Sequence, residues 1–384
     1  MRSPDVLIVG AGVIGAATAF HLTRLGTRAV TVIDRASVGS GMSSRSSALV
    51  RMHYTFPPEV DLAVRSDAMF DSWTELTGRP GCVRRTGFVR LVRPTETARL
   101  RANVAMQRAH GANAEVIEAA ELARLAPGMR TDDVQCAAWE PHGGYGDGAI
   151  VAGDLLAAAR EAGAVYWPNT PALALLTDGD RVTGADTDAG PVHAGVTVLA
   201  CGVWTPPLLA KVGIDLPIET ELHHVAVVRH PPGDGATLAC IDSMTQTYFR
   251  PESGAATLVG GFVGPRGTDP DAVPAIAQAA ELASLVGAAA RRVPSLADGG
   301  IAAGITGVYD MTPDARPMLG EVRPGLILAV GFSGMGFKIS PAVGEGLAEL
   351  IVAGSASHVD LSAFRPGRFA DGEPINPIAP YSDD

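Results

Sequence analysis

The hydrophobic pattern of the first forty residues predicts a strand, a tight glycine turn, a helix and a second strand. Residues 6–9 are all apolar, which is typical of a strand buried on both faces of a parallel sheet. The helix that follows carries Gly15 at a position suited to close packing on that sheet, and Gly26 is expected to end it. The second apolar strand closes at Asp34. The first forty residues therefore predict an α/β fold.

The remaining sequence alternates twice between two styles. Residues 161–170 and 196–204 resume the buried-strand pattern, and residues 326–350 again give strand, glycine turn and helix. Residues 83–139 instead carry a strand and two charged helices. Residues 216–306 show alternating strands and one alanine-rich helix that is expected to begin at Pro274. We predict one doubly wound, Rossmann-like domain built from three segments, with a β-rich α+β domain inserted between them.

The composition limits the classes of function. The 384 residues are 47% hydrophobic and 18% charged, with a net charge of −11. That charge argues against nucleic acid as a partner, since phosphate binding needs a basic face. The four cysteines lie far apart without the spacing of a zinc site, so we expect free thiols and no metal. No apolar run approaches the length of a membrane span and no signal peptide is evident, so a cytoplasmic location is expected.

The first glycine turn has the spacing of a dinucleotide-binding loop. Gly10, Gly12 and Gly15 lie directly between strand and helix, and Asp34 follows at about 20 residues. Gly10 would make the turn, Gly12 would admit a pyrophosphate, and Asp34 would accept hydrogen bonds from a ribose. The motif does not choose between NAD and FAD. A plain structural turn and a nicotinamide enzyme are the alternatives.

Several motifs together carry a resemblance to a known family. They are "VLIVGAGVIGAATAFHL", "GSGMSSRSSALVR", "VTVLACGVWT", "YFRP…LVGG", "TPDARPMLG" and "GFSGMGFKISPAVGEGLAEL", in this order along the chain. The sequence resembles the D-amino-acid oxidase/sarcosine oxidase superfamily of FAD enzymes. It is closest in motif to the monomeric sarcosine oxidase and sarcosine oxidase β-subunit branch. The resemblance implies an FAD-binding domain of residues 1–84, 149–217 and 320–384, and a substrate-binding domain of residues 85–148 and 218–319.

The resemblance also implies which residues hold FAD. In this family the second glycine turn, residues 334–336, ends at a helix N-terminus that faces the flavin pyrimidine edge, where it stabilises negative charge. The expected contacts lie in the two glycine turns, the serine-rich loop and the ends of later strands. They are Gly10, Gly12, Val13, Ile14, Gly15, Asp34, Arg35, Ser43, Ser44, Ser46, Ser47, Ala48, Ala172, Ala200, Cys201, Gly202, Trp204, Gly334, Met335, Gly336, Phe337 and Lys338.

Two cations are expected to hold a substrate carboxylate. Lys338 and Arg51 match the lysine of "GFK" and the serine-loop arginine that clamp the carboxylate in the sarcosine oxidase branch. Tyr309 and Tyr248 match site tyrosines of that branch, and His53 is a further candidate. Each residue has a structural alternative: Lys338 could extend to solvent, and Arg51 could pair with a surface glutamate. The tyrosines could be half-buried sheet residues, and a lone histidine is more often structural.

The sequence departs from the family at positions that attach or activate the flavin. Gly307 stands where monomeric sarcosine oxidases attach FAD through a cysteine, and Arg45 and Ser46 stand where the dimethylglycine dehydrogenase branch uses a histidine. FAD is therefore expected to be non-covalent. Val259 aligns with an oxygen-activating lysine, which leaves the electron acceptor open between dioxygen and another compound. The "HGG" at His142 is followed by no histidine that could carry a second flavin.

We therefore expect FAD-dependent oxidation of an amino acid or an N-substituted or cyclic amino acid. A hydride would pass from Cα or an N-alkyl carbon to flavin N5, giving an imine that water hydrolyses. The main alternatives are oxidation of a 2-hydroxy acid and an FAD-binding subunit of a heteromeric dehydrogenase. Substrate specificity is expected to lie in loops near residues 84–93 and 219–250, which no motif constrains.

Overall fold

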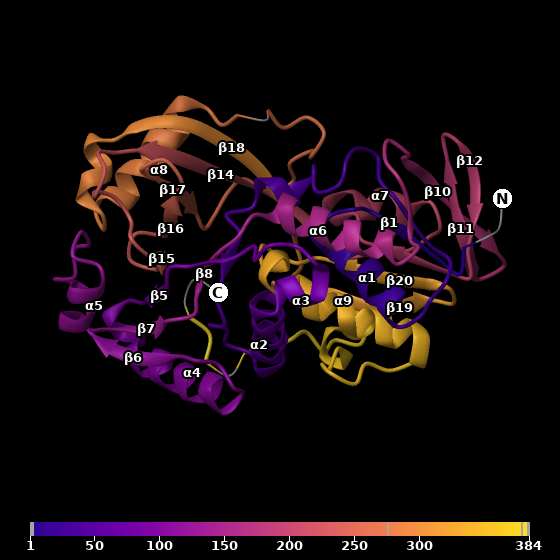
Figure 1. Cartoon of the computed structure of the whole chain (residues 1–384), viewed down its shortest axis with the longest axis horizontal. Helices are drawn as coiled ribbons and strands as arrows, with labels where there is room; N and C mark the ends of the chain where they lie inside the picture. The colour runs from indigo at the N-terminus through magenta and orange to yellow at the C-terminus, as the bar shows by residue number, and fades with distance from the viewer. Residues whose placement is uncertain (1–3, 275, 378, 382–384) are drawn as a thin grey trace.

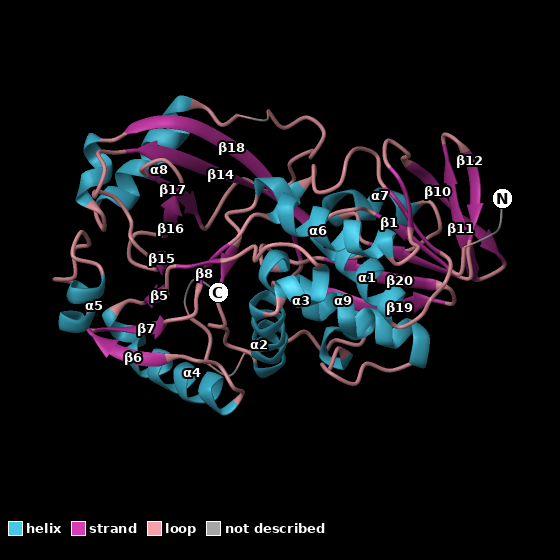
Figure 2. Ribbon diagram, in the orientation of Figure 1, coloured by secondary structure: helices cyan, strands magenta, loops and turns pink. Residues whose placement is uncertain are grey.

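The protein has two lobes that lie side by side (Figure 1). The computed structural model describes residues 4–274, 276–377 and 379–381. Helices and strands mix in one lobe, whereas long strands dominate the upper part of the other (Figure 2). The predicted fold class is confirmed. No helix among the described residues is long and apolar enough to cross a membrane.

The first lobe is built on a six-stranded sheet. Its neighbouring strands are all parallel except the edge pair of β19 and β20. In spatial order the strands are β19 (Met318–Arg323), β20 (Leu326–Val330), β13 (Val196–Leu199), β1 (Val6–Val9), β2 (Val30–Ile33) and β9 (Val165–Trp167). Strands β1, β2 and β20 are buried along their whole length, which explains their continuous apolar sequence.

The two faces of this sheet have different covers, because successive strand side chains point to opposite faces. Val6 and Ile8 pack against helices, and Leu7 and Val9 pack against the other cover. The helices of the first face are α1 (Val13–Arg24), α6 (Gly148–Glu161) and α9 (Gly336–Ala353), with α2 (Pro57–Asp71) on α9 and α3 (Trp73–Thr77) on α6. The second face carries α7 (Thr205–Ala210) and an antiparallel sheet of β10 (Ala172–Asp178), β11 (Arg181–Thr187) and β12 (Gly190–His193). This small sheet takes the place of a second helical layer.

The second lobe is built on an eight-stranded sheet. In spatial order its strands are β18 (Gly300–Met311), β14 (Glu219–Arg229), β17 (Ala256–Gly261), β16 (Thr247–Glu252), β15 (Ala239–Asp242), β5 (Phe88–Leu91), β7 (Cys136–Glu140) and β6 (Glu115–Glu118). One face packs against α8 (Ala279–Ala290) and α5 (Ala119–Leu125), and α4 (Thr97–Ala109) packs on β6 and β7. On the opposite face of the sheet, Tyr248 and Leu258 pack in one hydrophobic cluster with Leu49.

The start of α8 corrects one prediction. The helix begins at Ala279 and not at Pro274. Gln278 and Glu281 form a capping box, in which each side chain accepts a hydrogen bond from the other residue's backbone N–H. These reciprocal bonds satisfy the first free N–H groups of the helix, so they fix its start.

A small sheet joins the lobes. Its strands are β3 (Leu49–Val50), β8 (Gly144–Tyr145) and β4 (Arg84–Arg85), with β8 in the middle. Figure 1 shows β8 at the junction of the two lobes. The chain runs from β3 directly into Arg51, and from β8 into α6, so the junction places the serine-rich loop and its arginine between the two sheets.

Candidate active site

The first glycine turn brings the ends of two strands to the N-terminus of α1. Gly10 has a φ of +108°, and a Cβ on it would lie 2.3 Å from the carbonyl oxygen of Ala200, just after β13. A Cβ on Gly15 would lie 1.9 Å from the carbonyl oxygen of Gly10. Both distances are far below van der Waals contact, so only glycine fits at these two positions.

The N-terminus of α1 is open to an anion. It has no side-chain cap and no acidic residue in its first turn, where Val13 and Ile14 lie. The N–H of Val13 donates to Ser43 Oγ at 3.1 Å, and a Cβ on Gly12 would meet the same oxygen at 3.1 Å. Open backbone N–H groups at a helix N-terminus bind phosphate groups. The residues present therefore fit the pyrophosphate of FAD.

Asp34 is held at the carboxyl end of β2, beside this turn. Its Oδ2 accepts from the N–H of Ala11 at 2.7 Å and its Oδ1 from the N–H of Ala36 at 2.8 Å. A carboxylate oxygen can accept more than one hydrogen bond, so both oxygens can still receive ribose hydroxyls. Thr170 donates its N–H to the backbone oxygen of Asp34 at 2.7 Å, which brings Ala172, the first residue of β10, close to the same edge.

The neighbouring strand β13 ends at the same edge of the sheet. Ala200 donates its N–H to the carbonyl of Val9 at 2.9 Å, and the thiol of Cys201 lies 3.1 Å from that oxygen. Gly202, with a φ of +52°, opens a short 3-10 turn that ends at Trp204. These predicted cofactor residues therefore lie where Asp34 and the first glycine turn lie.

A residue of the second lobe reaches this edge as well. Arg35 places its guanidinium 4.9 Å from the ring centroid of Trp204 and pairs with Asp271 at 2.7 Å. Trp204 donates its indole N–H to the same Asp271 oxygen at 3.0 Å. Asp271 lies in the long connection between β17 and α8, and nothing in its sequence context singled it out.

The serine-rich loop is held partly by itself and partly by the second lobe. Ser46 Oγ accepts the N–H of Ala48 at 3.0 Å, and Ala48 has a φ of +51°. Ser47 accepts from Arg250 Nε through its carbonyl oxygen at 2.7 Å. Ser44 is exposed. The structure thus places Ser44 at the outer side of the loop, while Ser43 and Ser46–Ala48 lie further inside.

The second glycine turn forms another open helix N-terminus. Gly334 has a φ of +84°, Met335 is the N-cap, and α9 begins at Gly336 without a capping side chain or an acidic residue in its first turn. A Cβ on Gly334 would lie 2.6 Å from the ring of Tyr309. Phe337 is buried in the core of the first lobe. The turn is therefore packed tightly between Tyr309 and the helix.

Lys338 and Arg51 meet at this turn. Lys338 is only 7% exposed, and its Nζ donates to the carbonyl of Gly334 at 3.4 Å. Burial lowers the pKa of Lys338 well below its usual range, and the charge of Arg51 lowers it further. Arg51 donates to the carbonyl of His53 and lies 4.3 Å from the ring centroid of Tyr54. Neither cation forms an ion pair with a carboxylate of the described residues, so the solvent-exposed and surface-pair alternatives are wrong.

The two predicted tyrosines lie close enough for each side chain to affect the pKa of the other. The side chain of Ser47 acts on the pKa of Tyr248 as well, and Gly260 makes room for the tyrosine, since a Cβ there would lie 2.0 Å from its ring. Burial raises the pKa of Tyr248 well above its ordinary value and that of Tyr309 in the same direction. Both phenols are therefore protonated at neutral pH.

Sequence reasoning missed the histidine that stacks on Tyr309. The ring centroids of His223 and Tyr309 are 3.8 Å apart. His223 Nε2 lies 2.9 Å from Glu221 Oε1, and Arg266 Nε donates to the other Glu221 oxygen at 2.8 Å. Burial lowers the pKa of His223. The signal was present in "ETELHH", because residues two apart on a strand face the same side.

His53 is bound to the C-terminal part of the chain. It is 3% exposed, and its Nε2 lies 2.8 Å from the hydroxyl of Tyr381. Burial lowers the pKa of His53 well below its ordinary value, and the nearby charges of Arg90 and Arg51 add to this effect. The guanidinium of Arg90 lies 4.9 Å from the ring centroid of Tyr381 and 5.9 Å from that of Phe262. The sequence singled out neither Arg90 nor Tyr381.

These interactions form a closed series, which we call the contact ring; its last link, between Lys338 and Arg51, is an electrostatic interaction between their charges. In order of contact its members are Arg51, His53, Tyr381, Arg90, Phe262, Gly261, His223, Tyr309, Gly334 and Lys338. Tyr248 joins it through Tyr309. The five predicted catalytic residues are therefore brought together from both lobes, between the second glycine turn and the eight-stranded sheet.

Buried polar atoms without partners gather around Arg51. Arg51 Nε, His53 Nδ1 and Glu140 Oε1 have no hydrogen-bond partner among the described residues. Glu140 accepts the N–H of Met52 with its other oxygen at 2.7 Å, and burial raises its pKa to about 8. Buried polar groups are nearly always satisfied in folded proteins, so such a cluster marks a place for a ligand or ordered water.

The structure also places Val259 and Gly307, the positions at which the sequence departs from the family. Val259 is fully buried in the core on the face away from Tyr248, so Gly260 and not Val259 lies beside the tyrosine. A Cβ on Gly307 would have Arg45 as its nearest side chain, at 3.6 Å. The four cysteines are free.

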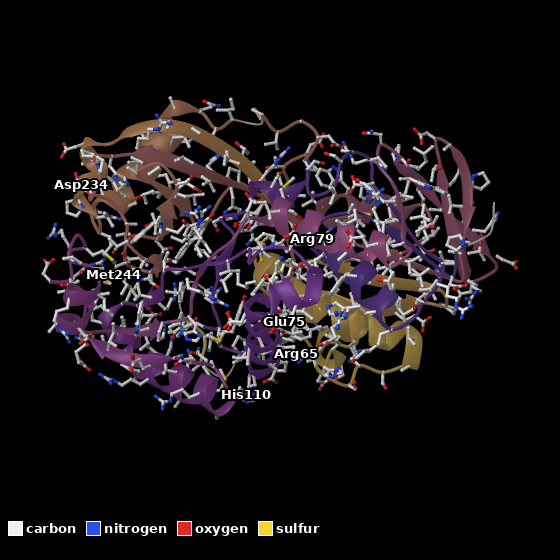
Figure 3. The ribbon with its side chains drawn as sticks, viewed as in Figure 1. Arg65, Glu75, Arg79, His110, Asp234 and Met244 are labelled. Carbon is white, nitrogen blue, oxygen red and sulfur yellow. The ribbon has the colours of Figure 1, made fainter. Side chains whose placement is uncertain are left out.

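Two other features lie apart from the contact ring. Asp67, Asp71 and His142 could together face one ion, but Arg85 pairs with both carboxylates at 2.5 and 2.6 Å and so compensates their charge. A surface hollow is lined by Arg65 of α2 and His110 after α4, among others; Figure 3 labels both residues. Neither of these residues belongs to the predicted site.

A parallel sheet with an open phosphate turn, together with a second glycine turn beside Lys338 and Arg51, is the arrangement expected of a dinucleotide-dependent oxidoreductase. Residues 5–350 match the family described as "FAD dependent oxidoreductase", DAO. The protein belongs to this family, and its cofactor is FAD. The predicted family, cofactor and enzymatic nature are confirmed.

Individual relatives agree with this assignment. Glycine oxidase from Geobacillus kaustophilus (strain HTA426) is 30% identical over 361 residues, which cover 90% of this chain and 92% of that protein. 4-Methylaminobutanoate oxidase (formaldehyde-forming) from Paenarthrobacter nicotinovorans is 26% identical over 382 residues, which cover 93% of this chain. The chain spans only 45% of the length of that second relative. The crystal structure of L-proline dehydrogenase from P. horikoshii superimposes with a TM-score of 0.90 at 25% identity, covering 97% of this chain and 100% of that one.

Proposed function

We propose that this flavoenzyme oxidises the C–N bond of an amino acid or of an N-substituted or cyclic amino acid. The observation that carries the proposal is the pair of cationic side chains at the second glycine turn, Lys338, which is buried, and Arg51, which is half-buried and acts on the charge of Lys338. Two like charges in a dry site repel each other, whereas a carboxylate between them forms strong charge-assisted hydrogen bonds. A substrate with a carboxylate is therefore the ligand that fits.

The relatives support an amine at the reacting end of that substrate. Their names refer to glycine, 4-methylaminobutanoate and L-proline, and each compound carries both an amine and a carboxylate. This shared chemistry favours an amino acid over a 2-hydroxy acid, which would use the same cations.

Each residue of the site has a role in this proposal. Arg51 and Lys338 hold the carboxylate and so orient the substrate. Tyr248 and Tyr309 stay protonated and can donate hydrogen bonds. His53 keeps one nitrogen, Nδ1, unpaired among the described residues, so it can exchange a hydrogen bond or proton with the substrate amine. Bound FAD supplies the hydride acceptor.

The placement of FAD and the division into domains belong to the proposal as well. Gly10–Gly15 and the N-terminus of α1 would hold the pyrophosphate, Asp34 would bind the ribose, and residues 334–338 would face the flavin, with Ser43–Ala48 alongside. Gly307 offers no side chain for attachment, which supports non-covalent binding. The proposed FAD-binding domain comprises residues 1–84, 149–217 and 320–384. Four free cysteines support a cytoplasmic location.

The test is the visible spectrum of the purified protein under anaerobic conditions. Sarcosine, proline, pipecolate, glycine and D-alanine are added in turn, with lactate and 2-hydroxyglutarate as controls. We expect an amino compound to bleach the flavin band and the hydroxy acids to leave it unchanged. Bleaching by a hydroxy acid alone would overturn the proposal. A yellow protein that no compound bleaches would favour an FAD-binding subunit that needs a partner. Readmitting air then shows whether dioxygen is the acceptor.

Arg51→Ala tests the carboxylate anchor directly. Loss of a buried charge-assisted contact costs about 1.5–3 kcal/mol, so half-saturation should rise about 10- to 150-fold while flavin content stays unchanged. Arg24→Ala, at the exposed end of α1, is the matched control and should leave both unchanged. Loss of flavin in Arg51→Ala would instead place Arg51 among the cofactor contacts.

A further inference from the structure

The C-terminal segment crosses from the first lobe to the second. Its start is fixed where Ile375 donates its N–H to Asp314 at 2.9 Å. Further on, two side chains of α4 bind its backbone: Asn103 donates to the carbonyl of Ala379 at 3.0 Å, and Arg99 to that of Pro380 at 3.1 Å. Figure 1 shows the end of this yellow segment between the two lobes, beside α4.

This path delivers Tyr381 into the contact ring. Tyr381 is only 4% exposed. Its hydroxyl lies 2.8 Å from His53 Nε2, its ring lies nearly parallel to that of His53 at 5.8 Å, and Arg90 lies 4.9 Å from its ring centroid. A buried tyrosine needs a partner for its hydroxyl, and His53 provides one. The side chain is thus held by two residues of the contact ring, His53 and Arg90.

Tyr381 differs from the other members of the ring in how it is held. His223 and Tyr309 belong to the long paired strands β14 and β18, and Lys338 belongs to α9. Tyr381 lies in a segment without helix or strand, bound to α4 through two backbone carbonyls. Its position in the ring is therefore set by side chains, and a change in this segment leaves the sheet and the glycine turns intact.

We propose that Tyr381 is a specificity-determining residue, whose ring forms the wall of the substrate compartment beside His53 and limits the size of the group that the substrate carries. The proposal rests on the proposed function, because it takes Arg51 and Lys338 as the carboxylate anchor. Arg51 contacts His53, and His53 contacts Tyr381. In this proposal the substituent extends from the anchored carboxylate past His53, where the Tyr381 ring is the next side chain in contact with His53.

The experiment compares the size preference of holoenzyme variants by ligand binding as well as by turnover. Tyr381→Ala removes the ring, and Tyr381→Phe keeps the ring but removes the hydroxyl. Acetate and benzoate serve as small and large carboxylate probes, with dissociation constants read from the change in the flavin spectrum. A pocket distinguishes ligands that differ by one methylene about 10-fold or more. We therefore expect the preference for benzoate over acetate to rise at least about 10-fold in Tyr381→Ala and by less than about 2-fold in Tyr381→Phe.

Asn376→Ala is the matched control within the same segment. Asn376 is exposed, and its side chain bonds only the local carbonyl of Pro374 among the described residues. It should leave the benzoate preference unchanged. Asn103→Ala, which releases the carbonyl of Ala379, should shift the preference in the same direction as Tyr381→Ala but by less. The same ordering should hold for kcat/KM with homologues of the best amino substrate.

The outcomes separate this inference from the proposed reaction. If Tyr381→Ala keeps its full flavin content and an unchanged preference for benzoate over acetate, the proposal that Tyr381 limits substrate size is overturned. If no amino compound reduces the flavin but Tyr381→Ala still favours benzoate, the wall stands and the proposed reaction falls. If Tyr381→Ala does not fold or loses flavin, Tyr381→Leu replaces it, because leucine fills part of the buried volume. An unchanged preference in a folded Tyr381→Leu would then overturn the proposal.

Discussion

Replacing Lys338 by methionine should lower carboxylate affinity and leave the protein as stable as before or more stable. Lys338 is 7% exposed, so its contact with a ligand is worth more than the ~0–1 kcal/mol of a surface ion pair. A buried hydrogen bond to a charged group is worth about 1.5–3 kcal/mol, which corresponds to a rise in Kd of about 10- to 150-fold. Methionine keeps the length of the side chain and removes its charge.

The stability of this variant should move in the opposite direction. Burial and Arg51 lower the pKa of Lys338 in the folded protein below its ordinary value of 10.5. The unfolded chain therefore binds more protons below that pH, so this group disfavours folding at neutral pH, and its penalty fades as pH rises towards 10.5. Lys338→Met removes the penalty. Its thermal midpoint relative to wild type should be highest at low pH and should fall back as pH rises.

The assay is a titration of acetate and of the best substrate against the flavin spectrum, from neutral to alkaline pH. In wild type, affinity should fall as pH rises through the lowered pKa of Lys338, and in Lys338→Met this part of the pH dependence should vanish. Lys211→Met is the control, because the chain has only these two lysines and Lys211 is exposed. A variant that is clearly less stable but binds acetate normally would refute the anchor and make Lys338 structural.

Three further predictions follow from single positions. Gly10→Ala should yield protein with little or no FAD, measured as the ratio of visible to ultraviolet absorbance, because its Cβ would lie 2.3 Å from Ala200 O. For Glu140, burial raises the pKa from 4.5 to about 8, so its contribution to stability is lost as pH rises between these values. Glu140→Gln should therefore gain stability relative to wild type between pH 5 and about 8 in urea unfolding, and a flat difference would contradict this pKa. Glu221→Ala leaves buried His223 without its carboxylate partner and should slow flavin reduction while flavin content stays normal; equal rates would show that the pair is only structural.

The parts of the structure that could be predicted from the sequence are determined by residues that are neighbours along the chain. The strand, glycine turn and helix at Gly10 and again at Gly334 follow from residues that are neighbours in sequence, because backbone sterics decide the turn. The anchors were found by matching short motifs, and the structure brings Arg51 and Lys338 together from β3 and α9. The start of α8 shows the limit of this reasoning, because Pro274 and the capping box at Gln278 are both local start signals, and only the structure shows which one is used.

The remaining parts depend on contacts between distant residues. His53 and Tyr381 are 328 positions apart, and no local pattern indicates that a tyrosine near the end of the chain lies beside a histidine near its start. Strand register is equally hard to fix, since a shift by one residue turns a side chain to the other face. The motif match places Val259 at the position of the family's lysine, and only the structure shows that Val259 is buried in the core while its neighbour Gly260 lies beside Tyr248.

The site also shows that the number of charged residues in a sequence does not reveal which of them are buried together in a functional site. Lys338, His53 and Glu140 all have pKa values shifted by burial towards their neutral forms. Burying each of them costs free energy, and a core selected for stability alone would carry apolar side chains in their place. Their grouping around Arg51 is therefore best explained by a ligand that restores charge balance when it binds. A carboxylate does this for the two cations, and an amine could bond His53 Nδ1, which has no partner among the described residues, so the proposed amino acid would satisfy both needs at once.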